Sequence, residues 1–150
     1  MPETTSSSNE QHGGRSPAAI TALLEIARDL TASLAAQDRY DRLLAAIRRV
    51  VPYDAACLLR LVGDDLVPAA GHGFLPEALA RRYPRAEHPR LDAILRSPDP
   101  VRFPPESPLP DPFDGLLAHY PHALRHIHAC MGCVLTEGGE VIGALTADAI

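Results

Sequence analysis

An imidazole and a thiol stand two residues apart near the end of the chain, at His128 and Cys130, and an acid follows at Asp148. In an extended strand, residues two apart point to the same face. An apolar run with two glycines at 138–139 separates the pair from Asp148, so a hairpin would bring the three side chains together. Nitrogen, sulfur and oxygen donors on one face suit a transition metal. The stretch predicts a small metal-sensing domain.

Whether Asp148 shares the face of Cys130 depends on the length of the turn. A two-residue turn at the two glycines pairs Cys130 with Ala147 and puts Asp148 on the opposite face. A three-residue loop that includes Glu137 sets His128 opposite Asp148, with a glycine in the left-handed position. The metal site requires the odd loop, and the sequence permits both turns.

The same residues also have purely structural interpretations. A histidine near a strand end is usually a hydrogen-bonded core residue, and a free cysteine is usually just buried. Cys133 has the opposite parity from Cys130, so the two thiols diverge on a regular strand, unless Gly132 supports a bulge. The open alternatives are a zinc or thiol-redox module that uses Cys130 and Cys133, and a module that binds no metal and only dimerises.

Two further acids, Asp111 and Asp114, lie in a proline-rich segment. Five prolines in the nine positions 104–112 forbid regular structure, because proline removes an amide donor and fixes its backbone. Aspartate beside proline usually makes turns, which is the interpretation favoured for Asp111. The stiff loop is predicted to hold the Asp114 carboxylate over a pocket. Arg90, at a predicted helix start, is either solvated or in contact with a site carboxylate.

The composition is that of a single soluble domain. Its 150 residues are 46% hydrophobic, enough for one core. No apolar stretch is long enough to cross a bilayer and the N-terminus carries no secretory signal pattern, so a cytoplasmic protein without membrane contact is expected. A net charge of -5 has the wrong sign for phosphate backbones, so no direct nucleic-acid contact is expected. Three cysteines argue against a disulfide framework.

The pattern of apolar residues predicts the elements that position these groups. Residues 1–16 are rich in Ser, Thr and Gly and are predicted to be a disordered tail, followed by one domain over 17–150. Ser16-Pro17 starts a first amphipathic helix, Gln37-Asp38 breaks the pattern, and a second helical stripe begins at Tyr40. The later elements are strands at 55–62 and 66–70, helices from 75 to about 83 and from 88 to about 96, a short strand at 101–103, and a terminal hairpin of 127–136 and 141–147.

This order of elements predicts an α+β fold, with helices against an antiparallel sheet. A further helix is expected to cover the sheet after the last strand. The sequence is therefore interpreted as a domain that is truncated at its C-terminus and that lacks this closing helix.

Several segments together resemble one known family. They are His-Pro-Arg-Leu at 88–91, Val-Arg-Phe-Pro at 101–104, Leu-Pro-Asp-Pro-Phe-Asp-Gly-Leu at 109–116, His-Ala-Cys at 128–130 and Gly-Ala-Leu-Thr-Ala-Asp at 143–148. In matching order, from about Ile20 to the end of the chain, they are similar to the N-terminal GAF domain of the NorR family of nitric-oxide-responsive bacterial transcription activators.

The resemblance implies a GAF fold that holds a mononuclear non-haem iron(II), with nitric oxide as its ligand. It implies a regulatory domain, not an enzyme, that restrains an AAA+ ATPase domain of the same parent protein in activators that work with an alternative sigma factor. The ATPase and helix-turn-helix domains of the family are absent from this sequence. A homodimer through the N-terminal helices is a further expectation. No motif supports cyclic-nucleotide binding.

The resemblance also carries the family's iron-site residues onto Arg90, Asp114, His128, Cys130 and Asp148. Arginine stays protonated and offers no lone pair, so it is a poor metal ligand. The predicted metal ligands are therefore Asp114, His128, Cys130 and Asp148. Arg90 is expected to pair with Asp114 or Asp148, or to donate to bound nitric oxide. A supporting role beside the metal is also assigned to Asp111.

Overall fold

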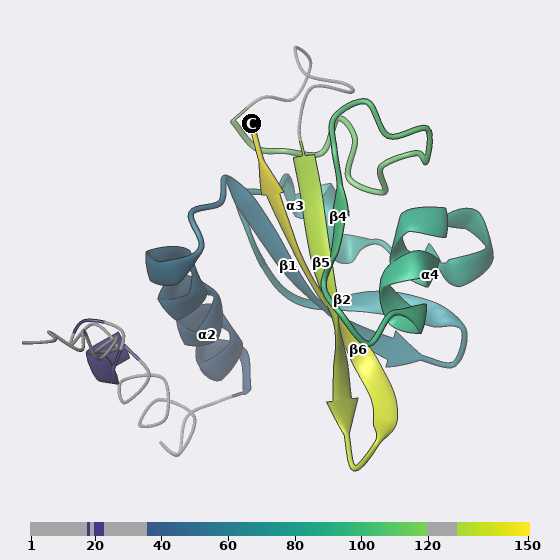
Figure 1. Cartoon of the computed structure of the whole chain (residues 1–150). Helices are drawn as coiled ribbons and strands as arrows, with labels where there is room; N and C mark the ends of the chain where they lie inside the picture. Colours follow the sequence, from purple (N-terminus) through teal and green to yellow (C-terminus); the bar gives the residue numbers. More distant parts are fainter. Residues whose placement is uncertain (1–17, 19, 23–35, 120–128) are drawn as a thin grey trace, which may run out of the picture.

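The computed structural model describes residues 18, 20–22, 36–119 and 129–150 (Figure 1). The predicted tail, the helix start at Ser16-Pro17, most of the first stripe, and His128 lie outside the described residues. A six-stranded antiparallel sheet with the order β3-β2-β1-β6-β5-β4 forms the centre. Helix α2 lies against one face of this sheet and α4 against the other (Figure 1). The α+β architecture predicted from the sequence is confirmed.

The observed elements follow the predicted order closely. Among the described residues, no helix combines the length and apolarity needed to cross a bilayer. In chain order the elements are α2 (Ala36–Val50), β1 (Ala55–Val62), β2 (Asp65–His72), α3 (Pro76–Ala80), β3 (Tyr83–Pro84), the 3-10 helix η1 (Arg85–Glu87), α4 (Pro89–Arg96), β4 (Val101–Phe103), β5 (Ala129–Glu137) and β6 (Glu140–Ala149).

Two predicted boundaries are wrong. Gln37 and Asp38 do not break the helical pattern, because both lie exposed in the first turn of α2, where an acid is favourable beside the positive helix end. Tyr83 does not belong to a helix: α3 ends at Ala80, and Tyr83 pairs with Leu66 in the sheet. Proline at the next position disfavours the helical conformation of Tyr83.

Two apolar cores lie on the two faces of the sheet. Under α2, Leu44 and Tyr53 pack against the strand residues Ala56, Leu58 and Ala70. The opposite face carries the larger core. Its buried members include Ala55, Cys57, Phe74, Tyr83, Leu91, Ile94, Phe103, Phe113, Cys130 and Ala144, and Cys130 belongs to the site described below.

The terminal hairpin closes with a two-residue turn, Gly138-Gly139. Both glycines have positive φ values, 58° and 85°, as a type I′ turn requires. Glu137 pairs with Glu140 directly outside the turn, so the structure has the two-residue alternative, and the interpretation that the site requires a three-residue loop is wrong. A regular ladder from this turn would pair Cys130 with Ala147, which is not what the structure has.

A β-bulge on β6 corrects the parity. Val141 pairs with Thr136 and Gly143 pairs with Leu135, so the ladder skips Ile142. A bulge places two residues of one strand opposite one residue of the other. All pairs beyond the bulge are shifted by one position, and Cys130 therefore pairs with Asp148.

Deletion of Ile142 is expected to leave the fold intact. The residue is 44% exposed and is skipped in the ladder, so its removal gives a regular hairpin with Cys130 still opposite Asp148. We expect the free energy of unfolding to fall by less than about 1 kcal/mol. Deletion of Leu145, inside the regular ladder, should instead abolish folding, because a one-residue slip moves every side chain to the other face. Urea unfolding followed by circular dichroism measures both.

Candidate metal centre

Asp111, Cys130 and Asp148 converge on one point of the larger core. One ligand atom of each residue lies within 4.8 Å of those of the other two. The centre is shielded from solvent, since Cys130 is 1% exposed, Asp148 0%, and the side chain of Asp111 6%. Among the described residues, these three side chains lie close enough together to hold a metal ion.

The sheet fixes two of the three residues. Cys130 and Asp148 face each other across β5 and β6, and they share the face of the sheet that carries the larger core. Phe103 of β4 pairs with Cys130 on one side, and Ala55 of β1 pairs with Asp148 on the other. Four hydrogen-bonded strands therefore hold the thiol and the carboxylate in place.

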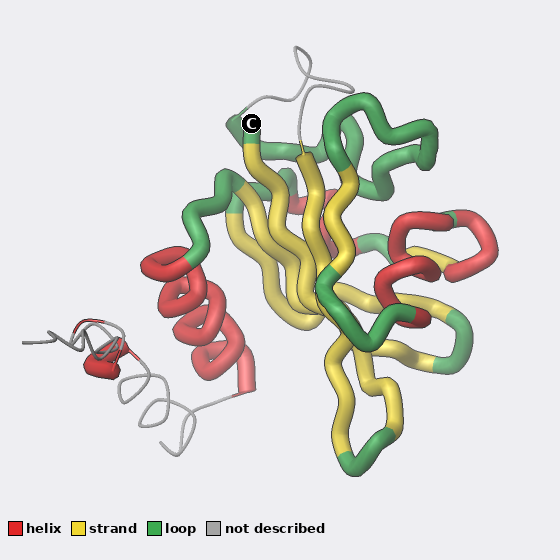
Figure 2. The backbone as a smooth tube through the Cα atoms, in the orientation of Figure 1, coloured by secondary structure: helices red, strands yellow, loops and turns green. Residues whose placement is uncertain are grey.

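The proline-rich loop supplies the third residue. The loop leaves β4 at the end of the sheet where β5 begins (Figure 2). One carboxylate oxygen of Asp111, Oδ1, accepts a 2.8 Å hydrogen bond from the amide of Phe113, which closes a turn. The prediction that Asp111 makes a turn is confirmed, and the same carboxylate also lies close to Cys130 and Asp148.

Arg90 of α4 ties the loop to the site. Its Nη1 donates to Asp111 Oδ2 at 2.8 Å, and its Nε donates to the carbonyl of Leu109 at 2.8 Å. Its guanidinium carbon lies 5.2 Å from the centre of the Phe103 ring. The arginine is buried, with 4% of its surface exposed, so the interpretation of a solvated Arg90 is wrong. The carboxylate that it contacts is that of Asp111, and the expected pairing with Asp114 or Asp148 stays a prediction.

Asp114 was predicted as the metal ligand from this loop and Asp111 as a supporting residue. Among the described residues, Asp111 is the loop acid that joins Cys130 and Asp148, which the sequence did not predict. Asp114 lies three residues later in the following turn, and one of its carboxylate oxygens, Oδ1, is also buried. Its role as a metal ligand stays a prediction.

The two thiols of the terminal hairpin lie on opposite faces of the sheet. Between Cys130 and Cys133 the ladder is regular, and the bulge considered at Gly132 is absent from these strands. Cys133 pairs with Leu145, which packs on the α2 side. A site that uses both thiols therefore has no geometric support. The remaining expected ligand, His128, directly precedes β5 in sequence and stays a prediction.

Burial and negative charge hold the thiols of this face in their neutral form. Burial, together with the charges of Asp148 and Asp111, raises the pKa of Cys130 far above its usual range. Burial and the charge of Asp148 raise the pKa of Cys57 to about 12. A cation bound between Asp111, Cys130 and Asp148 would reverse this effect at Cys130, because a coordinated thiol loses its proton.

The donor set fits a divalent transition metal. With Cys130 as thiolate, three anionic groups of the described residues face the Arg90 guanidinium, so the site favours a cation. Hydrogen bonds to the Asp111 carboxylate from Arg90 and from the Phe113 amide are compatible with metal binding, since a carboxylate oxygen has two lone pairs. Carboxylate and thiolate together suit a first-row metal better than Mg²⁺ or Ca²⁺, which prefer oxygen alone.

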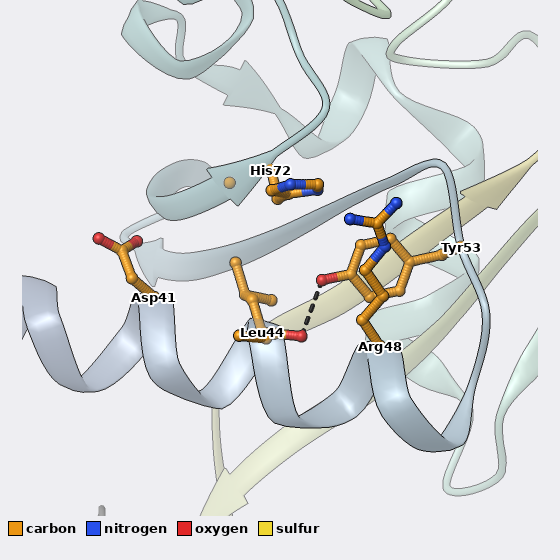
Figure 3. A pocket seen from close by; sticks show the side chains of 7 residues that line it. Asp41, Leu44, Arg48, Tyr53 and His72 are labelled. Atoms are coloured by element: carbon orange, nitrogen blue, oxygen red, sulfur yellow. Dashed lines mark hydrogen bonds between the residues drawn. The ribbon is translucent and has the colours of Figure 1, made fainter.

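A separate cavity of about 470 Å³ lies on the other face of the sheet, between α2 and β2 (Figure 3). Asp41, Leu44, Arg48, Tyr53 and His72 line it (Figure 3). The hydroxyl of Tyr53 donates to the carbonyl of Leu44 at 2.8 Å (Figure 3). Since the sheet separates this cavity from Cys130 and Asp148, it is not part of the candidate metal centre.

Comparison with known proteins agrees with the fold. The sequence profile of the GAF domain matches residues 35–149, and the chain belongs to this family. It is 44% identical, over 84% of its length, to the anaerobic nitric oxide reductase transcription regulator NorR of Aeromonas salmonicida, of which it covers 24%. The NorR protein of Vibrio vulnificus is also 44% identical, over 87% of this chain and 26% of that protein. The chain thus spans about a quarter of these relatives.

Solved structures show the same fold. The GAF domain of an Acinetobacter phosphoenolpyruvate-protein phosphotransferase superposes with a TM-score of 0.66 at 13% identity, over 90% of this chain and 78% of that one. The A. aeolicus nlh2 GAF domain in an inactive state gives 0.64 at 18% identity, over 86% and 77%. At these identities the likeness concerns the fold alone.

Removal of the Arg90 side chain is expected to be severely destabilising. The Arg90→Ala variant removes the buried positive charge that pairs with the Asp111 carboxylate and donates to the Leu109 carbonyl, which should lower the free energy of unfolding by about 3–5 kcal/mol. Arg82 provides the control, because its 3.0 Å pair with Asp65 is 60% exposed on the arginine side. Arg82→Ala should cost less than about 1 kcal/mol. Equal losses in urea unfolding would contradict the assignment.

The metal-free protein should lose stability in alkali. The Cys57 thiol has an ordinary pKa of 9.0 that folding raises to about 12, so the folded state keeps a proton that the unfolded chain releases. The stabilisation is complete below pH 9 and is lost as the pH rises toward 12, by at most about 1.4 kcal/mol per pH unit for this group. In urea unfolding at several alkaline pH values, Cys57→Ala should show a shallower loss; an unchanged slope would exclude Cys57 as a contributor.

Proposed function

We propose that this chain is the nitric-oxide-sensing domain of a transcription regulator and that it holds one non-haem iron(II) ion. The observation that carries the proposal is the buried convergence of Asp111, Cys130 and Asp148. The similarity to NorR regulators supports nitric oxide as the signal. The role is regulatory, without an enzymatic reaction in this domain.

Cys130 and Asp148 are the two ligands that the geometry favours most. Asp111 is the first choice for the loop carboxylate, because its oxygens lie near both, and Asp114 is the second choice, because the family resemblance selects it. His128 completes the set as the imidazole donor, two residues before Cys130 in the sequence. Arg90 holds Asp111 and balances its charge without contacting the metal.

Iron(II) suits this task better than zinc for an electronic reason. When bound, iron supplies d electrons to a diatomic ligand, whereas zinc has a filled shell and no redox chemistry. The chain's own residues exclude water, because the side chains of Phe103, Phe113 and Leu91 are buried around the site. An apolar surround admits a small neutral gas and keeps out hydrated ions.

The signal has a short route out of the site along β6. The backbone carbonyl of Asp148 accepts a 2.9 Å hydrogen bond from the amide of Asp54, and the Asp54 carboxylate accepts a 2.8 Å bond from the amide of Ile150. A change in the bonding of Asp148 is therefore felt two residues further along the chain. We propose that such a change releases an AAA+ domain of the parent protein, in the cytoplasm. Nitric oxide must then favour the released state by a few kcal/mol.

Anaerobic loading with iron(II), followed by nitric oxide, tests the proposal. The wild-type protein should bind about one iron per chain and give an electron paramagnetic resonance signal of an iron–nitrosyl species. Cys130→Ser and Asp148→Asn should each lower iron affinity by at least about tenfold, the scale of losing a metal-site partner. Cys133→Ser, on the other face, is the matched control and should bind iron normally.

The same measurement distinguishes the roles of the two loop acids and of the His128 imidazole. Asp111→Asn should reduce iron retention more than Asp114→Asn, and His128→Ala should abolish the nitrosyl signal. Zinc retention with no nitric oxide signal would favour the zinc module. If the wild-type protein folds but binds no metal, the alternative of a metal-free dimerisation module would be favoured.

A further inference from the structure

We infer that Gly132 is a positioning residue for the metal centre, because its missing side chain sets how closely α4 approaches the sheet. The inference rests on the proposed function only where it concerns metal binding. Gly132 lies in β5 on the same face as Cys130, two residues away, and pairs with Thr146 and Val101. Its backbone does not adopt a positive φ, so conformation does not require glycine at this position.

Space is what requires glycine there. A Cβ atom on Gly132 would lie 2.2 Å from Cδ1 and 2.9 Å from Cγ1 of Ile94, and 3.2 Å from the carbonyl oxygen of Leu145. Atoms of side chains do not approach this closely, so Ile94 or the whole helix must move if any side chain is added. Ile94 is fully buried, with 0% of its surface exposed. The space left by the missing side chain of Gly132 is therefore where Ile94, and with it α4, packs on the sheet.

The helix that packs on the sheet at Ile94 also carries the arginine of the site. Arg90 stands four residues before Ile94, and residues at this spacing lie on the same face of a helix. Arg90 holds the loop through the Leu109 carbonyl and the Asp111 carboxylate. The position of Asp111 therefore depends on the distance between α4 and β5.

The other half of the site cannot follow such a movement. Cys130 and Asp148 belong to the central ladder and are held by neighbouring strands on both sides. If α4 is lifted, Asp111 moves with Arg90 while the thiol and the second carboxylate stay. Gly132 thus fixes the separation between the loop ligand and the strand ligands.

The first test needs no metal. In the metal-free Gly132→Ala protein, the amides of Phe113 and Leu116 should exchange with deuterium at least about tenfold faster, because the loop loses its anchor. Amides in the β1–β2 ladder should keep their wild-type rates. The double variant Gly132→Ala with Ile94→Val removes the Cδ1 atom that lies at 2.2 Å, and it should recover most of the protection.

The second test measures metal binding in the same proteins. Gly132→Ala should weaken the affinity for iron(II) about 10- to 100-fold, the range seen when residues behind metal ligands are changed. The Ile94→Val double variant should regain most of the affinity. Cobalt(II) in place of iron adds a thiolate charge-transfer band, which reports whether Cys130 still binds the metal.

A matched pair elsewhere in the sheet controls for simple crowding. A Cβ on Gly71 of β2 would lie 2.4 Å from Cδ2 of Leu79 in α3, a contact of the same kind on a helix that does not carry Arg90. Gly71→Ala should destabilise the fold without affecting loop exchange or metal affinity. If Gly132→Ala does not fold alone, Ile94→Ala removes the same packing contact, with Leu79→Ala as its control, and should loosen the loop.

The outcomes separate the two proposals. Unchanged loop exchange in both Gly132→Ala and Ile94→Ala, or equal loosening by the Gly71 and Leu79 controls, would overturn the positioning role. Loss of loop protection in Gly132→Ala, with rescue by Ile94→Val, supports the positioning role even if the wild-type protein binds no metal. Failure of the wild-type protein to bind iron would overturn the proposed function and not the positioning role.

Discussion

The direct pairing of Cys130 with Asp148 is the constraint on which the site depends. Strand side chains alternate, so one residue more or less between the two would put the thiol and the carboxylate on opposite faces. The turn at Gly138-Gly139 has the wrong parity by itself, and the bulge at Ile142 corrects it. The bulge sits close to the exposed end of the hairpin, far along β6 from the site, where an extra residue disturbs little packing.

Charge explains why the rest of the site takes its form. Two carboxylates are buried beside one thiol, and the repulsion between the carboxylates is opposed by Arg90, which is itself almost inaccessible. Arg90 belongs to α4, and α4 packs on the sheet where Ile94 lies over Gly132, with no room for a Cβ atom between them. Electrostatics at the site and apolar packing at Ile94 are therefore parts of one arrangement.

Local patterns were enough to predict most elements. The strand at 55–62, the helix up to Arg96 and the strand at 101–103 follow from apolar periodicity and from proline. Tyr83 was misplaced because its backbone pairs with Leu66, a residue of another strand 17 positions earlier in the sequence. Such contacts leave no periodic trace in the neighbouring residues.

For the site, the sequence by itself determined the kinds of donor group and the elements that carry them. These are a thiol and an acid on adjacent strands, a stiff loop with two acids, and an arginine at a helix start. Only the tertiary structure decided that Asp111 lies beside Cys130 and Asp148, and that Arg90 is its partner. Both acids satisfy the same local turn chemistry, so the sequence does not distinguish them, whereas the contact with Arg90 depends on where α4 packs on the sheet. The face of Asp148 was likewise undecided by the sequence, because the pairing of β6 with β5, and not the residue type at position 142, places the bulge.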